Sequence, residues 1–582
     1  MKNFLKTTLA VFVALILFTI ISGIVSVSML GAIASMGSAE TTLQDNSVLK
    51  INLTGTLTER VNEESLEYLL AQANNQPTPI GLNDLRTSLK KAAVADQIKG
   101  LYLNCGLLSA SPASAQELRS LIEKFKTESG KPVYAYGDNY SQSAYWIASV
   151  ADTIVLNPQG IVALTGLSTT IPFFHEALDK LGVKMEIFKV GTFKSAVEPY
   201  ILDEISEPNR LQNEKMLSSM WSEIVEDIAS SRNISTDQVN QFIDNGMMFS
   251  EVNDIVTLGF VDSAMYRNEM TVLLKERFSK DFKIVTTKQM KNAPSTEKFS
   301  MNKVAVLYAT GEIDSGSEGE MNSEDIVKEL NKLASDDNVK AVVLRVNSPG
   351  GSAFGSEQMW FAAKQLRDKK PLIVSMSDYA ASGGYYMSCI ADTIVAQPTT
   401  LTGSIGIFGM YPNFTGVTDK LGVNFCTVKT NDLSDLGNTM RPMTDSERAI
   451  IQNHVNRGYE LFISRCAEGR NTSNDEIKLV AEGRVWSGND ALSLSLVDVL
   501  GGLDEAIAIA AAKAELTDNY TVTEYPKQKD ALTQLLEDLT GESLTSTILK
   551  SKLKPETYFF NQYRQILNMQ GTQAIMPYRI EL

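Results

Sequence analysis

Short apolar runs alternate along the chain with longer stretches in which apolar residues recur every three or four positions. In the second half, the apolar runs at 340–347, 371–376 and 392–397 are predicted to be buried strands. The stretches at 323–336 and 356–369 have the apolar spacing of helices. Because strands alternate with helices in this way, we predict an α/β fold in which helices cover a mostly parallel sheet.

The same pattern occurs twice. Without gaps and at an offset of 240 positions, 138–189 and 378–429 are identical at 17 of 52 positions, and both contain ADTIV and DKLGV. Ordinary residue usage would give roughly three or four identities. We therefore predict a tandem duplication of one α/β unit, with repeats at 45–290 and 301–512 and a linker around 291–300.

The length of the chain agrees with more than one domain, since 582 residues are too many for a single hydrophobic core. The tail at 513–582 is polar with scattered apolar residues. No role is predicted for this tail.

The amino-terminal segment carries Lys2 and Lys6 and then no charged residue before Glu40. The uncharged run exceeds the roughly 20 residues that span a bilayer and the roughly 7–15 of a signal-peptide core. We predict a transmembrane anchor at 8–38, with 1–7 in the cytoplasm and the body of the protein outside it. A cleaved signal peptide is the alternative, because ASMGSA offers the small residues of a cleavage site.

Charge and residue usage argue against several kinds of function. The net charge of −16 argues against a nucleic-acid partner, which needs clustered Lys and Arg. The two histidines, His175 and His454, stand in no motif, so no metal site or cofactor is expected. The cysteines also lack metal-binding spacing, and whether any of them form a disulfide is left open: Cys105, Cys389, Cys426 and Cys466.

A glycine-rich turn, NSPGGS, follows the first predicted strand of the second half and contains Gly350 and Gly351. Glycines at such a place let the backbone run close to a ligand with its N–H groups open. An ordinary turn between a strand and a helix explains this motif equally well.

Ser382 lies at the predicted start of a helix, and Gly383 follows it. A serine at this position is a common helix cap. As a nucleophile, it would place developing negative charge among free N–H groups at the positive end of the helix dipole. The motif alone does not decide between these two roles.

Comparison of the two repeats indicates a base for such a nucleophile. The first repeat has Gln142 where the second has Ser382, and the second has Ser434 where the first has Lys194. Lysine is usually a solvated surface charge, but burial against apolar walls lowers its pKa until it can act as a base. Since each repeat keeps one member, we predict that Ser382 and Lys194 work as a pair.

Four motifs, VNSPGGS, AASGGYY, LTGSIGIFG and GTFKSAVEPY, stand in the order seen in a known family. From about residue 48 to 512, the chain resembles the signal peptide peptidase A family of bacterial membrane proteases in its long, two-repeat form. The resemblance implies two crotonase- or Clp-like α/β repeats in a homotetramer anchored in the bacterial inner membrane, with the body on the periplasmic side. It also implies hydrolysis of signal peptides left in the membrane after preprotein cleavage.

The same resemblance assigns roles to residues of this chain. It implies a serine peptidase without a cofactor, in which Ser382 is the nucleophile and Lys194 is the general base. The supporting residues that it implies are Gly383 with Gly350 or Gly351 for the oxyanion hole, and Ser404 for a hydrogen bond to the lysine amine.

Two other classes of function compete with this one. A non-catalytic membrane scaffold could keep the fold, but drift would then be expected to remove either Ser382 or Lys194. A crotonase-type acyl-CoA enzyme would be expected in the cytoplasm and would rely on carboxylates rather than on this pair. Reaction with a serine-directed covalent probe distinguishes the three.

Overall fold

The computed structural model describes most of the chain, in the ranges 41–63, 65, 68, 71–72, 78–294, 300–316, 319–517, 519–527 and 571–576. The predicted anchor at 8–38 lies outside the described residues. Within these ranges, no helix is long and apolar enough to cross a membrane.

The first repeat is built on a parallel sheet with the strand order β10–β1–β3–β4–β6–β9. Buried apolar side chains pack between this sheet and its helices. In sheet order the strands span Lys283–Thr286, Ser47–Thr58, Ile98–Ser109, Val133–Gly137, Thr153–Leu156 and Ser263–Ala264. Its helices include α3 (Leu82–Val94), α4 (Pro112–Ser129) and α5 (Gln142–Ala148).

The second repeat has a corresponding sheet with the order β18–β16–β14–β12–β11–β20, parallel except where β16 meets β18. Its strands span Val485–Ser487, Leu401–Gly403, Leu372–Ala381, Val339–Ser348, Lys303–Thr310 and Thr521–Tyr525, and β15 (Thr393–Ala396) pairs with β14. Its helices include α12 (Ser323–Ser335), α13 (Ala353–Arg367), α14 (Gly383–Ser388) and α19 (Leu503–Lys513).

The predicted elements of the second half are present. The runs at 340–347, 371–376 and 392–397 form β12, β14 and β15, and the two helical stretches form most of α12 and α13. β12 is buried along almost its whole length, as expected for a parallel strand with both faces covered. The predicted α/β fold is therefore confirmed. β20 lies in the tail for which no role was predicted, and it extends this sheet beside β11.

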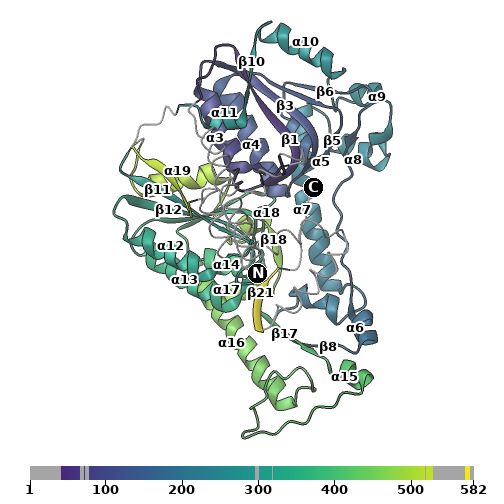
Figure 1. Ribbon diagram of the computed structural model, residues 1–582, viewed down its shortest axis with the longest axis vertical. Helices are drawn as coiled ribbons and strands as arrows, with labels where there is room; N and C mark the ends of the chain where they lie inside the picture. The colour runs from purple at the N-terminus through teal and green to yellow at the C-terminus, as the bar shows by residue number, and fades with distance from the viewer. Residues whose placement is uncertain are drawn as a thin grey trace, which may run out of the picture.

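The two repeats lie one above the other in Figure 1, the first in purple and blue and the second mainly in green. Helix α7 (Glu207–Arg232) begins beside the second repeat and runs up into the core of the first. It reaches β18, where Ser219 Oγ lies 2.8 Å from Ser487 Oγ. Residues far apart in the sequence therefore meet between the repeats.

A small sheet contains strands from both repeats and from the tail. Its order is β13 (Gly350–Ser352), β21 (Gly571–Ile575), β17 (Phe408–Asn413) and β8 (Lys184–Lys189), and all neighbours are antiparallel. β8 comes from the first repeat and β17 from the second, so this sheet fixes the two repeats to each other beside the glycine-rich turn.

A buried ion cluster also joins the repeats. Arg345, on β12 of the second repeat, is fully buried and lies 2.7 Å from Glu59 Oε1 and 2.6 Å from Glu117 Oε2, both from the first repeat. Its guanidinium also donates to the Ser375 hydroxyl at 2.9 Å. Burial raises the pKa of the Glu117 carboxyl, while the charge of Arg345 acts in the opposite direction. The guanidinium therefore compensates two carboxylates that have little access to water.

We expect Arg345→Met to destabilise the protein strongly. Removing one partner of a buried ionic group typically costs about 3–5 kcal/mol, because the remaining charge is left without compensation. Arg367→Met is the matched control, since Arg367 pairs with Asp392 where both side chains are partly exposed, and such a pair contributes about 1 kcal/mol or less. Urea unfolding followed by tryptophan fluorescence measures both, and equal shifts would contradict a compensating role for Arg345.

Candidate active site

Three predicted residues meet where the repeats join. Lys194 Nζ, from the first repeat, lies 2.7 Å from Ser382 Oγ, from the second. The same nitrogen lies 3.0 Å from both the hydroxyl and the carbonyl oxygen of Ser404. All three residues are fully buried. The structure thus brings together side chains that are 188 positions apart in the sequence.

The backbone of Ser382 is held in an unusual conformation between β14 and α14. Its φ of 55° and ψ of −113° lie in a region that residues other than glycine rarely adopt. Its N–H donates to Gly403 O at 2.8 Å, and its carbonyl oxygen accepts from Tyr386 N at 2.8 Å. Its side chain makes no capping hydrogen bond to the helix. The hydroxyl therefore faces Lys194 instead of serving as a helix cap.

Burial lowers the pKa of the Lys194 ammonium well below the ordinary value of 10.5. In the described part of the chain, its hydrogen-bond partners are the neutral oxygens of Ser382 and Ser404. No carboxylate there offsets the cost of removing a positive charge from water. The neutral amine is therefore favoured, and a neutral amine can accept a proton from a neighbouring hydroxyl.

A loop of the second repeat fixes the backbone of Lys194. A Cβ on Gly483 would lie 2.6 Å from Lys194 Cβ, so only glycine fits at that contact. Phe193 N–H donates to Glu482 O at 2.9 Å, and Ser404 N–H donates to Arg484 O at 2.7 Å. Residues 482–484 therefore place the lysine and Ser404 relative to each other.

Gln212, on α7, supports the same arrangement from the other side. Its side-chain amide donates to Phe193 O at 3.1 Å and to Ser195 Oγ at 2.9 Å, on both sides of Lys194. Its side-chain oxygen accepts from Val485 N at 3.3 Å. Sequence reasoning missed Gln212 and Gly483, and no motif marks either residue.

The glycine-rich turn lies against the residue that follows Ser382. A Cβ on Gly350 would lie 2.8 Å from Gly383 N, and φ is 106° at Gly350 and 147° at Gly351. The Gly350 N–H already donates to Ser348 Oγ at 3.2 Å. Of the predicted oxyanion residues, Gly350 therefore already uses its N–H within the turn.

The counterparts of the pair in the opposite repeats have other surroundings. The Gln142 side-chain oxygen accepts from Thr165 N and Gly166 N, each at 3.0 Å, and so closes a local loop. Ser434 lies in an exposed loop and accepts from Asn431 N at 3.1 Å. Neither arrangement joins a hydroxyl to an amine.

Other groups that the sequence left open are accounted for in the described residues. All four cysteines are free, and no group of three or more His, Cys, Asp or Glu side chains in the described ranges could hold a metal ion. His175 is the first residue of α6 (His175–Leu181) and is partly exposed. Its Nδ1 lies 2.9 Å from Asp203 Oδ1. It therefore has a partner of its own, separate from Lys194 and Ser382.

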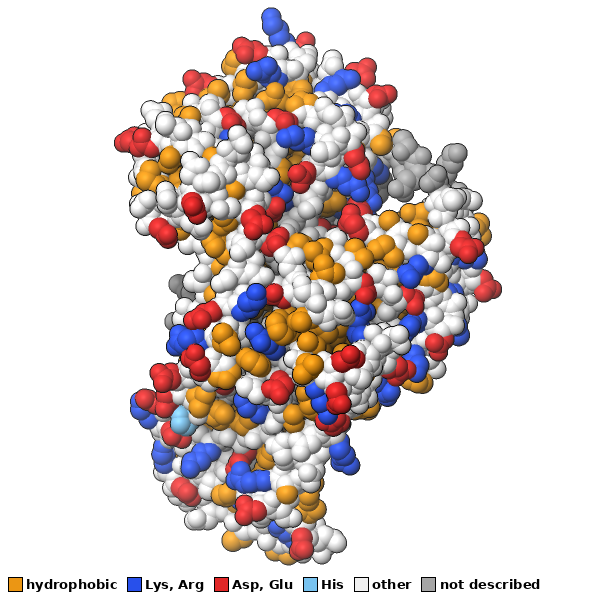
Figure 2. Space-filling model, turned by 180° about the vertical axis from the view of Figure 1, so that it is seen from behind, with side chains coloured by type: hydrophobic (Ala, Val, Ile, Leu, Met, Phe, Trp, Pro, Cys, Tyr) orange, Lys and Arg blue, Asp and Glu red, His pale blue; other side chains and the backbone are white. Residues whose placement is uncertain are grey.

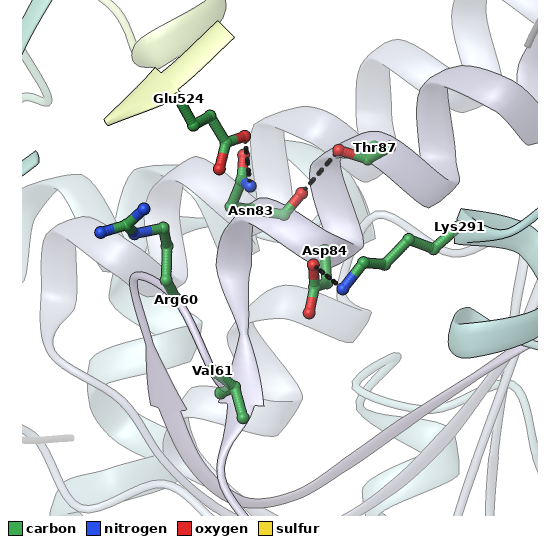
Figure 3. Close-up of a pocket in the computed structure, with 7 residues that line it drawn as sticks. All are labelled: Arg60, Val61, Asn83, Asp84, Thr87, Lys291 and Glu524. Atoms are coloured by element: carbon green, nitrogen blue, oxygen red, sulfur yellow. Dashed lines mark hydrogen bonds and ion pairs between the residues drawn. The ribbon is translucent and has the colours of Figure 1, made fainter. Parts of the chain in front are cut away.

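A cavity of about 270 Å³ lies elsewhere between the repeats (Figure 3). Its charged and polar side chains largely satisfy one another, since Asp84 pairs with Lys291 at 2.7 Å and Asn83 donates to Glu524 at 2.7 Å. None of the predicted site residues lines it, and its Thr87 hydroxyl donates to Asn83 O at 2.9 Å. The complete lining is Arg60, Val61, Asn83, Asp84, Thr87, Lys291 and Glu524.

The chain is similar in sequence to several proteins that are named as proteases. Protease 4 of Haemophilus influenzae is 35% identical over 500 residues, which cover 81% of this chain and 80% of that protein. Serine protease SPPA, chloroplastic, of Arabidopsis thaliana is 31% identical over 76% of this chain and 67% of its own. A protein of Enterococcus faecium, provisionally named signal peptide peptidase SppA, is 36% identical over 39% of this chain and 66% of its own.

The matched family profile falls on both repeats. Residues 125–279 and 364–517 each match Peptidase family S49, which confirms the duplication and the resemblance inferred from the motifs. Each match includes one copy of the related segment, with Lys194 in the first and Ser382 in the second. The chain belongs to peptidase family S49.

Proposed function

We propose that this protein is a serine endopeptidase with a Ser382–Lys194 dyad, which degrades residual signal peptides at the membrane after preproteins have been processed. The observation that carries the proposal is the 2.7 Å separation of Lys194 Nζ and Ser382 Oγ, two fully buried side chains. The burial of the lysine supplies a neutral base, and the strained backbone of Ser382 presents its hydroxyl to that base.

The proposed reaction begins when the Lys194 amine takes the proton of Ser382 Oγ as this oxygen attacks the carbonyl carbon of a peptide bond. The oxyanion that forms accepts hydrogen bonds from the backbone N–H groups of Gly383 and Gly351. Each such donor is typically worth about 3–4 kcal/mol in the transition state. The protonated Lys194 then donates its proton to the leaving amine. Neutral again, Lys194 takes a proton from the water that attacks the acyl-enzyme, and it returns this proton to Ser382 Oγ as the acid product leaves.

Ser404 orients the lysine in this scheme. Its hydroxyl and carbonyl oxygens occupy two hydrogen-bonding directions around Nζ, which leaves the third directed at Ser382. The Ser404 N–H donates to Arg484 O, which fixes Ser404 within the second repeat. The Lys194 amine belongs to the first repeat, but residues of the second repeat therefore position it. Ser404 is thus a positioning residue and does not touch the substrate.

The pH dependence of kcat/KM tests the dyad. Lys194 must be neutral to act as a base, and burial lowers its pKa, so activity should rise with pH through a midpoint well below 10.5. Initial rates with a quenched fluorescent peptide across the neutral and alkaline range measure this midpoint. A midpoint near 10.5 would mean that the base is a solvated lysine, and the proposed site would be rejected.

Apolar peptides are the proposed substrate class. Two of the similar proteins are named as SppA proteases, one of them a signal peptide peptidase, and signal peptides have an apolar core. Figure 2 shows hydrophobic side chains over the middle of one face, with charged side chains between them and at both ends of the molecule. An apolar surface of this kind suits contact with apolar chains or with a membrane.

We also propose that each repeat is of the crotonase or Clp type and that the protein is a homotetramer in the bacterial inner membrane. The run at 8–38 would anchor it, with the body on the periplasmic side, because Lys2 and Lys6 flank the run. In spheroplasts, added protease should digest the body of the protein without lysis. Protection that ends only when the membrane is broken would contradict this orientation.

A further inference from the structure

The tail supplies a strand to the small sheet beside the active site. β21 lies between β13 and β17 and is antiparallel to both. Its register pairs Gly351 with Ala574 on one side and Phe408 with Gln573 on the other. A single extended segment thus hydrogen-bonds to the glycine-rich turn and to a second strand at the same time.

The position of Ala574 relates this strand to the chemistry. A Cβ on Gly383 would lie 3.1 Å from the Ala574 carbonyl oxygen, and a Cβ on Gly350 would overlap that oxygen. Met576 N–H donates to Pro349 O at 2.6 Å and continues the pairing. The Ala574 carbonyl therefore lies between the glycine-rich turn and the residue after Ser382, beside the proposed oxyanion donors.

The side chains that follow Ala574 contact both walls of the site. Ile575 packs with Val197, three positions after Lys194, and with Phe408 of β17. Met576 packs with Ala381, which precedes Ser382. Ala574, Ile575 and Met576 are all buried. The segment is therefore seated in the site by its backbone and its side chains together.

We propose that 571–576 is an internal pseudosubstrate, which occupies the groove where an extended peptide substrate binds and which each substrate must displace. This inference rests on the proposed peptidase function. Substrates would add a strand between β13 and β17, with the carbonyl of a small residue at the position of Ala574 and apolar residues after it.

Two truncations of the full chain test this role. A chain that ends at Gln570 lacks β21, whereas a chain that ends at Met576 keeps it and serves as the matched control. Apparent affinity falls in proportion to the fraction of molecules with an open groove, so an open fraction of about one tenth predicts an increase of about tenfold in kcat/KM on removal of β21. The control should match the full chain.

The second measurement is the rate at which a serine-directed fluorophosphonate labels Ser382. It separates the pseudosubstrate proposal from the proposed Ser382–Lys194 dyad. Faster labelling and faster turnover in the shorter chain support the pseudosubstrate, and a synthetic peptide of residues 571–578 should then inhibit that chain competitively. Equal rates in both truncations would overturn it. If no form is labelled or active at all, the Ser382–Lys194 dyad itself fails.

Substitution of one residue gives the same test without truncation. Ala574 is fully buried beside the glycine-rich turn, so Ala574→Glu should expel the strand and reproduce the activation. Gln573→Glu should have a smaller effect, because the Gln573 side chain is only half-buried. Activation by Gln573→Glu and none by Ala574→Glu would contradict the register described above.

Equivalent segments of the two repeats differ in their partners. β8 of the first repeat pairs with β17 of the second, and the helices before and after them, α6 and α15 (Thr415–Leu421), also touch, since Lys420 Nζ donates to Lys180 O. At the repeat offset of 240, the counterpart of β8 is 424–429 and the counterpart of β17 is 168–173.

Neither counterpart forms a strand within the described residues. The segment 424–429 is exposed throughout, with Val428 99% and Phe425 55% accessible. The segment 168–173 alternates between half-buried and exposed positions along its length. Among the described residues, the second repeat thus leaves 424–429, the counterpart of β8, without a strand partner. The first repeat leaves 168–173, the counterpart of β17, without one in the same described part.

We infer that 424–429 of one copy pairs with 168–173 of a second copy, in the antiparallel register that β8 and β17 have within one chain. The contact uses two different surfaces, so it is heterologous and closes a ring when repeated through the proposed homotetramer. Gln142 and Ser434 occupy the dyad positions at this second junction, and the junction would therefore be structural.

A single cysteine substitution tests the register. Glu186 pairs with Tyr411, so their counterparts Cys426 and Ile171 should face each other across the contact. Directly opposed residues of antiparallel strands have Cα atoms about 4.5–5.5 Å apart, a spacing that suits a disulfide. Because Cys426 is an exposed free cysteine, Ile171→Cys in the full chain should give disulfide-linked oligomers under mild oxidation.

Two controls make that result specific. Thr170→Cys shifts the thiol to the opposite face of the strand and should crosslink far less, and Ile171→Cys with Cys426→Ser should not crosslink. Val428→Asp, measured by light scattering, should reduce the oligomer. Equal crosslinking by Thr170→Cys, or none by Ile171→Cys in a protein that is oligomeric by light scattering, would overturn the inferred pairing.

Discussion

Ser382→Ala should lower kcat/KM for peptide hydrolysis by about four orders of magnitude or more and abolish labelling by a serine-directed probe. Loss of a nucleophile costs on this scale in serine peptidases, because the remaining catalysis comes only from binding and the oxyanion hole. The variant should stay folded, since the Ser382 side chain makes no capping hydrogen bond to α14. Circular dichroism and the thermal midpoint measure the folding.

Gln142→Ala is the matched control for that substitution. Gln142 occupies the same position in the other repeat, and its side chain closes a loop through Thr165 and Gly166. The control should lose some stability and keep nearly all of its turnover. If Ser382→Ala retained activity close to that of the unchanged protein, another nucleophile would have to be sought, and the proposed mechanism would be rejected.

Lys194→Arg should inactivate the protein about as completely as Ser382→Ala. Guanidinium keeps its proton in proteins and cannot take one from a hydroxyl, although it preserves the positive charge. Lys194→Ala should show a similar loss, because members of one catalytic unit are not additive. Their combination with Ser382→Ala should therefore add little to either single substitution, and steady-state kinetics with the same fluorescent peptide measures this.

The arginine variant also separates two roles of the lysine. If Lys194→Arg kept most of its turnover, a positive charge at this place would be what matters, and the base would have to be another residue, with His175 and His454 as the histidines available. Lys91→Arg is a suitable control, since Lys91 donates to carbonyl oxygens of the linker region and lines neither site nor groove. Its activity should be unchanged.

The parts of the fold that depend on local pattern could be predicted from the sequence. β12 is mostly apolar because both of its faces are covered, and α12 shows regular apolar spacing because only one face is buried. The duplication allowed Lys194 to be predicted. Alignment of the two repeats shows that the first lacks the serine and the second lacks the lysine, and this comparison needs no structure. Ser404 entered through the resemblance, and the structure places it at the lysine amine.

The parts that depend on contacts between distant segments could not be predicted. Gly483 matters because its missing side chain admits the backbone of Lys194, a contact across nearly three hundred positions. Gln212 acts through one side chain on an ordinary helix. β21 has five residues, too few to show the alternation of apolar and polar positions that marks a strand. No sequence pattern in β21 or in the glycine-rich turn indicates that the two segments pair.

The division of the proposed dyad between two repeats affects when the protein could act. Lys194 is synthesised long before Ser382, and the loop that holds the lysine, 482–484, comes later still. A growing or half-folded chain therefore has a lysine without a hydroxyl, and later a hydroxyl without a placed lysine. Proteolytic capacity would appear only after both repeats had docked, so an unfinished chain could not yet cleave the other proteins of its cell.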